Sequence, residues 1–117
     1  MDDDEEERTV NVGKHAALIR GLRVLVVSEG KAVTHWLPPA GDVTIGRFTG
    51  SKVVINHDTL SRMHAILRVT ADAMTIEDLG SENGTFVREA RIKPGEPVPF
   101  STGDVVRLGD VILIFRI

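Results

Sequence analysis

The chain of 117 residues has no cysteine and no tyrosine, and it holds only one tryptophan and four phenylalanines. Without cysteine, neither a disulfide framework nor a thiolate metal site can form. With so few aromatic rings and no strongly basic stretch, the chain lacks the stacking and charge of a nucleic-acid surface. No apolar run approaches the ~18 residues of a membrane span, and no secretory signal follows the acidic start. These absences favour a cytoplasmic protein that binds neither nucleic acid nor membrane.

Negative charge is concentrated at one end of the chain. Of its seventeen Asp and Glu residues, six form an unbroken block at positions 2–7, which leaves eleven against fourteen Lys and Arg in the remainder. An acidic block of this kind is expected to stay solvated and disordered. We therefore predict a disordered tail over residues 1–16 and one mildly basic domain over residues 17–117, long enough to bury a core.

Short segments in which apolar and polar residues alternate follow one another along the domain, with turn residues between them. This pattern is typical of β-strands, and no segment has a convincing 3.6-residue period. Strands are expected at residues 22–27, 32–37, 43–45, 53–55, 65–69, 74–77, 85–88, 91–92, 104–108 and 111–117. About ten short strands predict an all-β antiparallel β-sandwich whose loops carry function. Because an apolar strand runs to the last residue, Ile117, we expect the chain to be a fragment of a larger protein.

Three segments bring polar residues to the turns between these strands. They read Val-Thr-Ile-Gly-Arg at 43–47, Leu-Ser-Arg-Met-His-Ala at 60–65 and Asp-Leu-Gly-Ser-Glu-Asn-Gly-Thr-Phe-Val at 78–87. In this order and spacing they are similar to the motifs of the forkhead-associated (FHA) domain family. Ile92 and residues 103–109 resemble the last strands of that family, so the resemblance covers residues 21–117. It implies an eleven-stranded β-sandwich that binds phosphothreonine peptides through loops at one end.

Arg47, Ser61 and Arg62 are the candidate phosphate-binding residues. A guanidinium offers a planar fork that pairs with phosphate through two charge-assisted hydrogen bonds, and Arg47 comes directly after an expected strand. Ser61 can donate its hydroxyl to a phosphate oxygen, and the resemblance makes it the second phosphate contact. Arg62 adds charge beside it. In isolation, Arg47 would be a surface charge, Ser61 a turn residue and Arg62 a solvated side chain.

The resemblance also assigns one residue to the ligand backbone and several to the shape of the site. Asn83 has an amide that both donates and accepts, as reading an extended main chain requires, and it could also be a left-handed Asn-Gly turn residue. His64 is implied to brace the loops, and Gly84 and Thr85 to form and support the turn. Gly46 permits close backbone packing or an unusual φ.

Residues flanking these positions bear on ligand choice. Asn56, His57 and Asp58 precede the serine loop and are expected to line the groove. Glu82 departs from the family, which usually carries Thr, Ser, Lys or Arg there. Its carboxylate would repel a nearby phosphate, although exposure and salt would weaken this repulsion. The same carboxylate could favour a basic residue in the ligand.

Two chemical alternatives use the same residues. Ser61, His64 and Asp78 are the residue types of a hydrolase triad, but no nucleophile elbow or oxyanion turn accompanies them. His57 and Asp58 could join His64 as metal ligands, but nothing completes a coordination set. We therefore predict a protein that is not an enzyme and has no metal or cofactor.

The sequence thus predicts a phosphothreonine-recognition module acting downstream of a Ser/Thr kinase. Its partner would be a phosphothreonine-containing protein or peptide. The domain is expected at the N-terminus of a larger regulator, such as a bacterial transcription regulator. The alternative is a β-sandwich that pairs with proteins, or dimerises, independently of phosphate. A further hypothesis is that Thr9, directly behind the acidic block, is phosphorylated and folds back on the domain.

Overall fold

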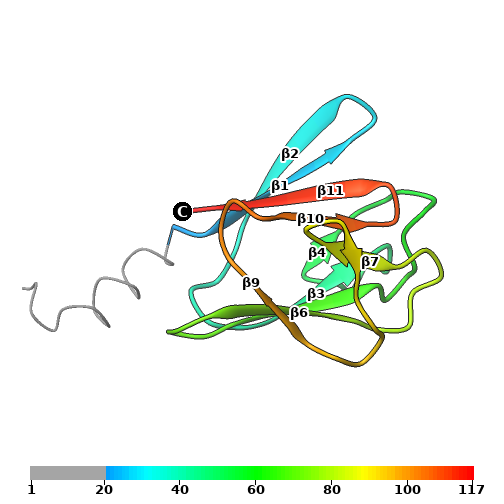
Figure 1. Cartoon of the computed structure of the whole chain (residues 1–117). Helices are drawn as coiled ribbons and strands as arrows, with labels where there is room; N and C mark the ends of the chain where they lie inside the picture. Colours follow the sequence, from blue (N-terminus) through cyan, green and yellow to red (C-terminus); the bar gives the residue numbers. More distant parts are fainter. Residues whose placement is uncertain (1–20) are drawn as a thin grey trace, which may run out of the picture.

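The computed structural model describes residues 21–117, which form two β-sheets packed face to face (Figure 1). This part of the chain contains eleven strands and no helix, so it holds no helix capable of crossing a bilayer. The strands are β1 (Arg23–Ser28), β2 (Lys31–Trp36), β3 (Gly41–Gly46), β4 (Val53–Val54), β5 (Ala65–Val69), β6 (Met74–Asp78), β7 (Thr85–Val87), β8 (Ala90–Arg91), β9 (Val98–Phe100), β10 (Val105–Leu108) and β11 (Val111–Arg116). The predicted all-β sandwich is confirmed. The predicted tail, residues 1–16, and Thr9 lie outside the described residues.

The two sheets differ in size. One has six strands in the order β2-β1-β11-β10-β7-β8, and the other has five in the order β4-β3-β5-β6-β9. Within the described residues every pairing is antiparallel except that of β3 with β4, where Ile45 lies opposite Val53. This pair departs from the predicted antiparallel arrangement, because the chain loops out after Gly46 and returns beside β3 in the same direction for only two residues.

The core lies between the sheets and is built by alternation along the strands. In β11, Val111, Leu113 and Phe115 are buried while the residues between them are only half-buried. The ring of Phe115 lies 4.9 Å from that of Phe100 in β9, which belongs to the other sheet. Such tilted aromatic contacts add to the apolar area removed from water and tie the two layers together.

One strand was not predicted. Strand β9 contains Pro99 and is preceded by Pro97, and proline weakens the case for a strand in a sequence because it cannot donate to the ladder. Among residues 21–117, β9 lies at the edge of its sheet and pairs only with β6. An edge tolerates the missing donor, which is why a proline-bearing segment can be a strand here.

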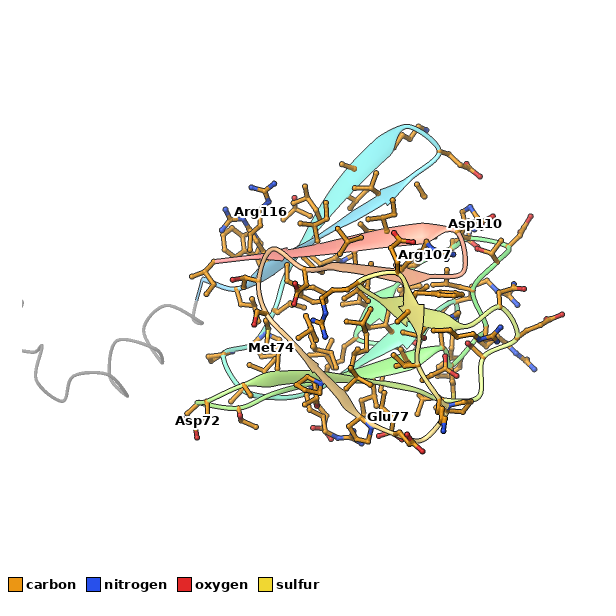
Figure 2. The ribbon with its side chains drawn as sticks, viewed as in Figure 1. Asp72, Met74, Glu77, Arg107, Asp110 and Arg116 are labelled. Carbon is orange, nitrogen blue, oxygen red and sulfur yellow. The ribbon has the colours of Figure 1, made fainter. Side chains whose placement is uncertain are left out.

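Several loops lie at one end of the sandwich, and two of them are tight hairpin turns. The β1–β2 hairpin turns through Glu29 and Gly30, both with positive φ, and the β10–β11 hairpin turns at Gly109, with φ of 55°. Figure 2 places Asp110 in this second turn, at the end of the domain opposite Arg116. The β4–β5 and β6–β7 loops lie at the same end as Asp110 (Figure 1).

Candidate functional site

The segment after β3 and the loop before β5 run side by side. The N–H groups of Arg47 and Phe48 donate to the carbonyl oxygens of Ser61, at 3.2 Å, and Arg62, at 3.0 Å. Gly46 makes this approach possible, because a Cβ at this position would collide with the Arg62 carbonyl oxygen. Its φ lies outside the left-handed region, so close contact and not an unusual backbone angle requires glycine here.

The guanidinium of Arg47 is held by the neighbouring loop. Its Nε donates to the carbonyl oxygen of Leu60 at 2.6 Å, and Leu60 is itself buried in the core. The side chain is otherwise exposed. With Nε engaged, the two terminal nitrogens are left as a planar pair of donors, the arrangement that pairs with a phosphate or carboxylate.

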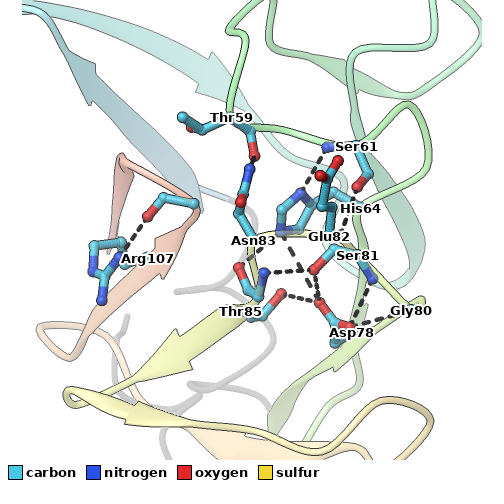
Figure 3. Close-up of polar contacts among 12 residues, drawn as sticks. Thr59, Ser61, His64, Asp78, Gly80, Ser81, Glu82, Asn83, Thr85 and Arg107 are labelled. Carbon is cyan, nitrogen blue, oxygen red and sulfur yellow. Dashed lines mark hydrogen bonds and ion pairs between the residues drawn. The ribbon is translucent and has the colours of Figure 1, made fainter.

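Ser61 lies in the same loop with its hydroxyl already oriented. The hydroxyl oxygen accepts a hydrogen bond from the N–H of Glu82 at 3.0 Å (Figure 3). Because this bond uses an oxygen lone pair, the hydroxyl hydrogen remains able to donate to a ligand. Arg62 follows in the chain and is exposed. The backbones of Arg47, Ser61 and Arg62 thus lie side by side in two adjacent loops, and both arginine side chains are exposed.

His64 is a buried brace between two loops. Its Nδ1 accepts a hydrogen bond from the N–H of Ser61 at 3.0 Å, and its Nε2 pairs with the carbonyl oxygen of Gly84 at 3.0 Å (Figure 3). These partners require a neutral ring with its proton on Nε2. Burial lowers the pKa of His64, although the Gly84 carbonyl and the nearby Asp78 carboxylate act in the opposite direction.

Asp78 anchors the turn between β6 and β7. Its carboxylate is 2% exposed and accepts hydrogen bonds from the hydroxyls of Ser81, at 2.5 Å, and Thr85, at 2.6 Å. The N–H groups of Gly80 and Ser81 add two more, each at 3.0 Å. Burial raises the pKa of Asp78, but these hydrogen bonds outweigh burial and hold the pKa below its usual range. A charged carboxylate therefore shapes the turn that presents Asn83.

Asn83 is exposed and joins the β6–β7 loop, in which it lies, to the β4–β5 loop. Its Nδ2 donates to the carbonyl oxygen of Thr59 at 2.9 Å, which leaves the amide oxygen and the second amide hydrogen for a ligand (Figure 3). Gly80 and Gly84 are the left-handed residues of this turn, with φ of 80° and 88°, and Asn83 has no positive φ, so the alternative of a left-handed Asn83 is wrong.

Thr59 supports the candidate site and was not among the residues predicted from the sequence. Its hydroxyl oxygen accepts from the N–H of Asp110 at 2.9 Å and lies 2.9 Å from Nδ1 of His57. It thereby connects the β4–β5 loop to the β10–β11 turn as well as to Asn83. The turn is fixed on its other side by Arg107, whose Nη1 donates to the Gly109 carbonyl oxygen at 2.6 Å. A threonine 51 positions from its partner carries no local signal of such a role.

The flanking residues occupy different positions. Asn56 and Asp58 are exposed, whereas His57 is half-buried and is occupied with Thr59. Nε2 of His57 lies 3.4 Å from the carboxylate of Glu29 at the tip of the β1–β2 hairpin. His57 is thus part of the support of the β4–β5 loop, and Glu82 is an exposed side chain on the opposite loop.

The described residues form neither the hydrolase triad nor the metal site considered above. Ser61 presents its backbone N–H to His64, not its hydroxyl, and both ring nitrogens of His64 have other partners. Asp78 lies 4.0 Å from the His64 ring and is occupied by the Ser81 and Thr85 hydroxyls. Among residues 21–117, no group of three His, Asp or Glu side chains is placed to hold a metal ion.

Comparison with known proteins gives the family. The FHA domain family model matches residues 43–109. FhaB of Mycolicibacterium smegmatis, an FHA domain-containing protein, is 37% identical over 95 residues, which are 80% of this chain and 60% of FhaB. The chain therefore spans less than two thirds of that relative. It belongs to the FHA domain family, whose members are binding modules.

Solved structures agree with this assignment. The FHA domain of FhaA, determined in complex with the intracellular domain of Rv3910, superimposes with a TM-score of 0.71 and 28% identity over 81% of this chain and 99% of that one. An FHA domain from a study of phosphothreonine-dependent FHA domain interactions gives a TM-score of 0.70 with 29% identity, and covers 81% and 96% of the two chains. Phosphopeptide recognition is thus the function associated with this fold and family.

Proposed function

We propose that this domain binds phosphothreonine in a partner protein as part of Ser/Thr kinase signalling, without chemistry of its own. The observation that carries the proposal is the anchored guanidinium of Arg47, whose Nε is held on the Leu60 carbonyl while its terminal nitrogens stay available. A preorganised donor pair loses little freedom on binding, which favours a dianionic ligand.

The ligand is held at three points. Arg47 and the Ser61 hydroxyl bind the phosphate, and exposed Arg62 adds positive charge beside them. Asn83 binds the main chain next to the phosphothreonine through the amide atoms that Thr59 leaves open. The partner is a phosphothreonine-containing protein or peptide that an upstream Ser/Thr kinase has modified.

The test is a titration with phosphothreonine, phosphoserine and unphosphorylated forms of a degenerate peptide library. Binding is expected only with phosphate, and more tightly for phosphothreonine. Arg47→Ala should abolish it, while Arg47→Lys should restore only part, because an ammonium cannot form the paired contact. A well-folded wild-type domain that binds no phosphopeptide would refute the proposal.

The cellular setting belongs to the same proposal. The domain acts in the cytoplasm as the N-terminal module of a larger regulator, such as a bacterial transcription regulator. Phosphorylated Thr9, which lies outside the described residues, competes for the site. Kinase-treated Thr9→Ala protein should then bind an external phosphopeptide more tightly than treated wild type, and equal affinity would rule this competition out.

A second function is favoured by one observation. Strand β2 lies at the edge of the six-stranded sheet, and its Val33 and Trp36 are 55% and 68% exposed. An apolar edge with which no further strand pairs within residues 21–117 is suited to pairing with another chain. If the domain dimerises in this way, sedimentation should show a dimer that Arg47→Ala keeps and Val33→Lys loses.

A further inference from the structure

Three large apolar side chains are exposed beside the proposed phosphate site. Phe48 is 51% exposed, Met63 59% and Leu79 36%, and each comes from a different loop. Two of them directly follow the phosphate-binding arginines in the chain, since Phe48 comes after Arg47 and Met63 after Arg62. Single exposed apolar residues are ordinary, but a group from three loops at one end of a domain marks a contact surface.

These side chains line a shallow hollow of about 100 Å³, with Ala65 and Ile45 behind them. A more open groove lined by Phe48, Arg62 and Met63 shares two of its walls. The hollow therefore opens toward one of the arginines proposed to bind phosphate. Its lining is mainly apolar, so it suits a hydrocarbon side chain and not a second charged group.

Backbone hydrogen bonds hold the hollow in shape. The N–H of Phe48 donates to the Arg62 carbonyl at 3.0 Å, and the N–H of Leu79 donates to the His64 carbonyl at 2.9 Å. The ring of Phe48 packs over Gly50, where a Cβ would collide with the ring edge. The absence of a side chain at Gly50 thus provides the place in which the ring lies.

The hollow and Asn83 lie at opposite ends of residues 59–63. Thr59, at the start of this segment, accepts the hydrogen bond of the Asn83 amide, and Arg62, near its end, accepts that of the Phe48 backbone. Between them, the Leu60 carbonyl holds Arg47. An extended ligand with its phosphate on Arg47 and its main chain on Asn83 would pass over Phe48 and Met63 on the other side of the phosphate.

We propose that this hollow binds an aliphatic side chain of the phosphorylated ligand, on the side of the phosphothreonine away from Asn83. This inference rests on the proposed function and adds a sequence preference to it. Phe48 and Met63 form the walls of the subsite and Leu79 closes it. The ligand is therefore a phosphothreonine peptide with a leucine-like residue near the phosphothreonine, on one side only.

The experiment uses the 117-residue chain and a phosphothreonine peptide that has alanine at every flanking position. A series of further peptides each replaces one of these alanines with leucine. Isothermal titration should show one position at which leucine tightens binding by about tenfold, as burial of a side chain of this size predicts. Aspartate at that position should remove the gain. An equal response at all positions would overturn the inference.

Variants locate the preference on the protein. Met63→Ser and Phe48→Ser should each reduce the leucine gain to less than about threefold while the all-alanine phosphopeptide binds as before. Val105→Ser, which removes an exposed apolar side chain from β10 in the other sheet, is the matched control and should leave the gain intact. Because all three positions are exposed, the variants should fold.

The outcomes separate the two proposals. If Arg47→Ala abolishes all phosphopeptide binding but the leucine gain is absent or survives in Met63→Ser and Phe48→Ser, the hollow is not a ligand subsite and phosphate recognition stands. If the wild type binds no phosphopeptide, the proposed function and this subsite both fail. Self-association lost in Met63→Ser would instead show that a second copy of the chain covers the hollow.

Discussion

The hydroxyl of Thr85, at the start of β7, donates a 2.6 Å hydrogen bond to the carboxylate of Asp78, at the end of β6. These strands belong to different sheets, so the bond joins the two layers at the base of the turn that carries Asn83. Both residues are almost fully buried. The geometry of the turn that carries Asn83 therefore depends on a buried charged group.

Removing this bond should destabilise the domain. Thr85→Val keeps the shape of the side chain but deletes one donor to a buried carboxylate, and we expect the free energy of unfolding to fall by about 2 kcal/mol. Asp78→Asn, which loses the charge for all four donors, should have a larger effect. Thr75→Val, on a half-buried position of β6, is the control. Urea denaturation measures all three, and a Thr85→Val effect no larger than the control would contradict this account.

Acid should destabilise the domain in two steps. Burial lowers the pKa of His64, so between that value and the ordinary value near 6.5 the unfolded chain binds a proton that the folded chain does not. Stability is then complete above about pH 6.5 and falls as the pH decreases. The pKa of Asp78 lies below its usual value of about 3.9, so its contribution is lost only at still lower pH. Thermal melts at a series of pH values test this, because the melting temperature of His64→Gln should change less with pH just below pH 6.5 than that of the wild type. An equal pH dependence of the two proteins would refute the assignment.

Glycine should be required at position 46 but not at position 50. A Cβ at Gly46 meets the backbone of Arg62, which cannot rotate away, so Gly46→Ala should lower the free energy of unfolding by about 2 kcal/mol and weaken phosphopeptide binding. A Cβ at Gly50 meets only the ring of Phe48, which can move. Gly50→Ala should therefore leave stability nearly unchanged. Equal effects of the two substitutions, measured by denaturation, would disprove this distinction.

The charge of Glu82 should weaken phosphate binding. Glu82→Gln removes an exposed carboxylate while the backbone N–H that orients Ser61 is kept. We expect phosphopeptide affinity to rise roughly threefold at low ionic strength, with a smaller gain at high salt. Glu77→Gln, on strand β6 and paired with Arg68, is a control for net charge. A gain that is equal for both variants would assign the effect to overall charge.

Much of the fold followed from local patterns. Alternation along segments such as 65–69 and 111–116 predicted strands that are present, because a strand with one face on the core must alternate. The residues Gly30 and Gly109 marked hairpin turns that the structure contains. Strand β9 was missed because its proline argues against a strand wherever the position within the sheet is unknown.

The sequence by itself determined the strand-rich architecture and the residue types at the loops, since alternation and turn chemistry act over a few neighbouring residues. Only the tertiary structure decided which loops meet. The contacts of Thr59 with Asp110 and Asn83, and the hollow between Phe48, Met63 and Leu79, join segments distant in the chain. Such contacts depend on the order in which strands pair within each sheet and on how the sheets stack, and local alternation is compatible with many such orders.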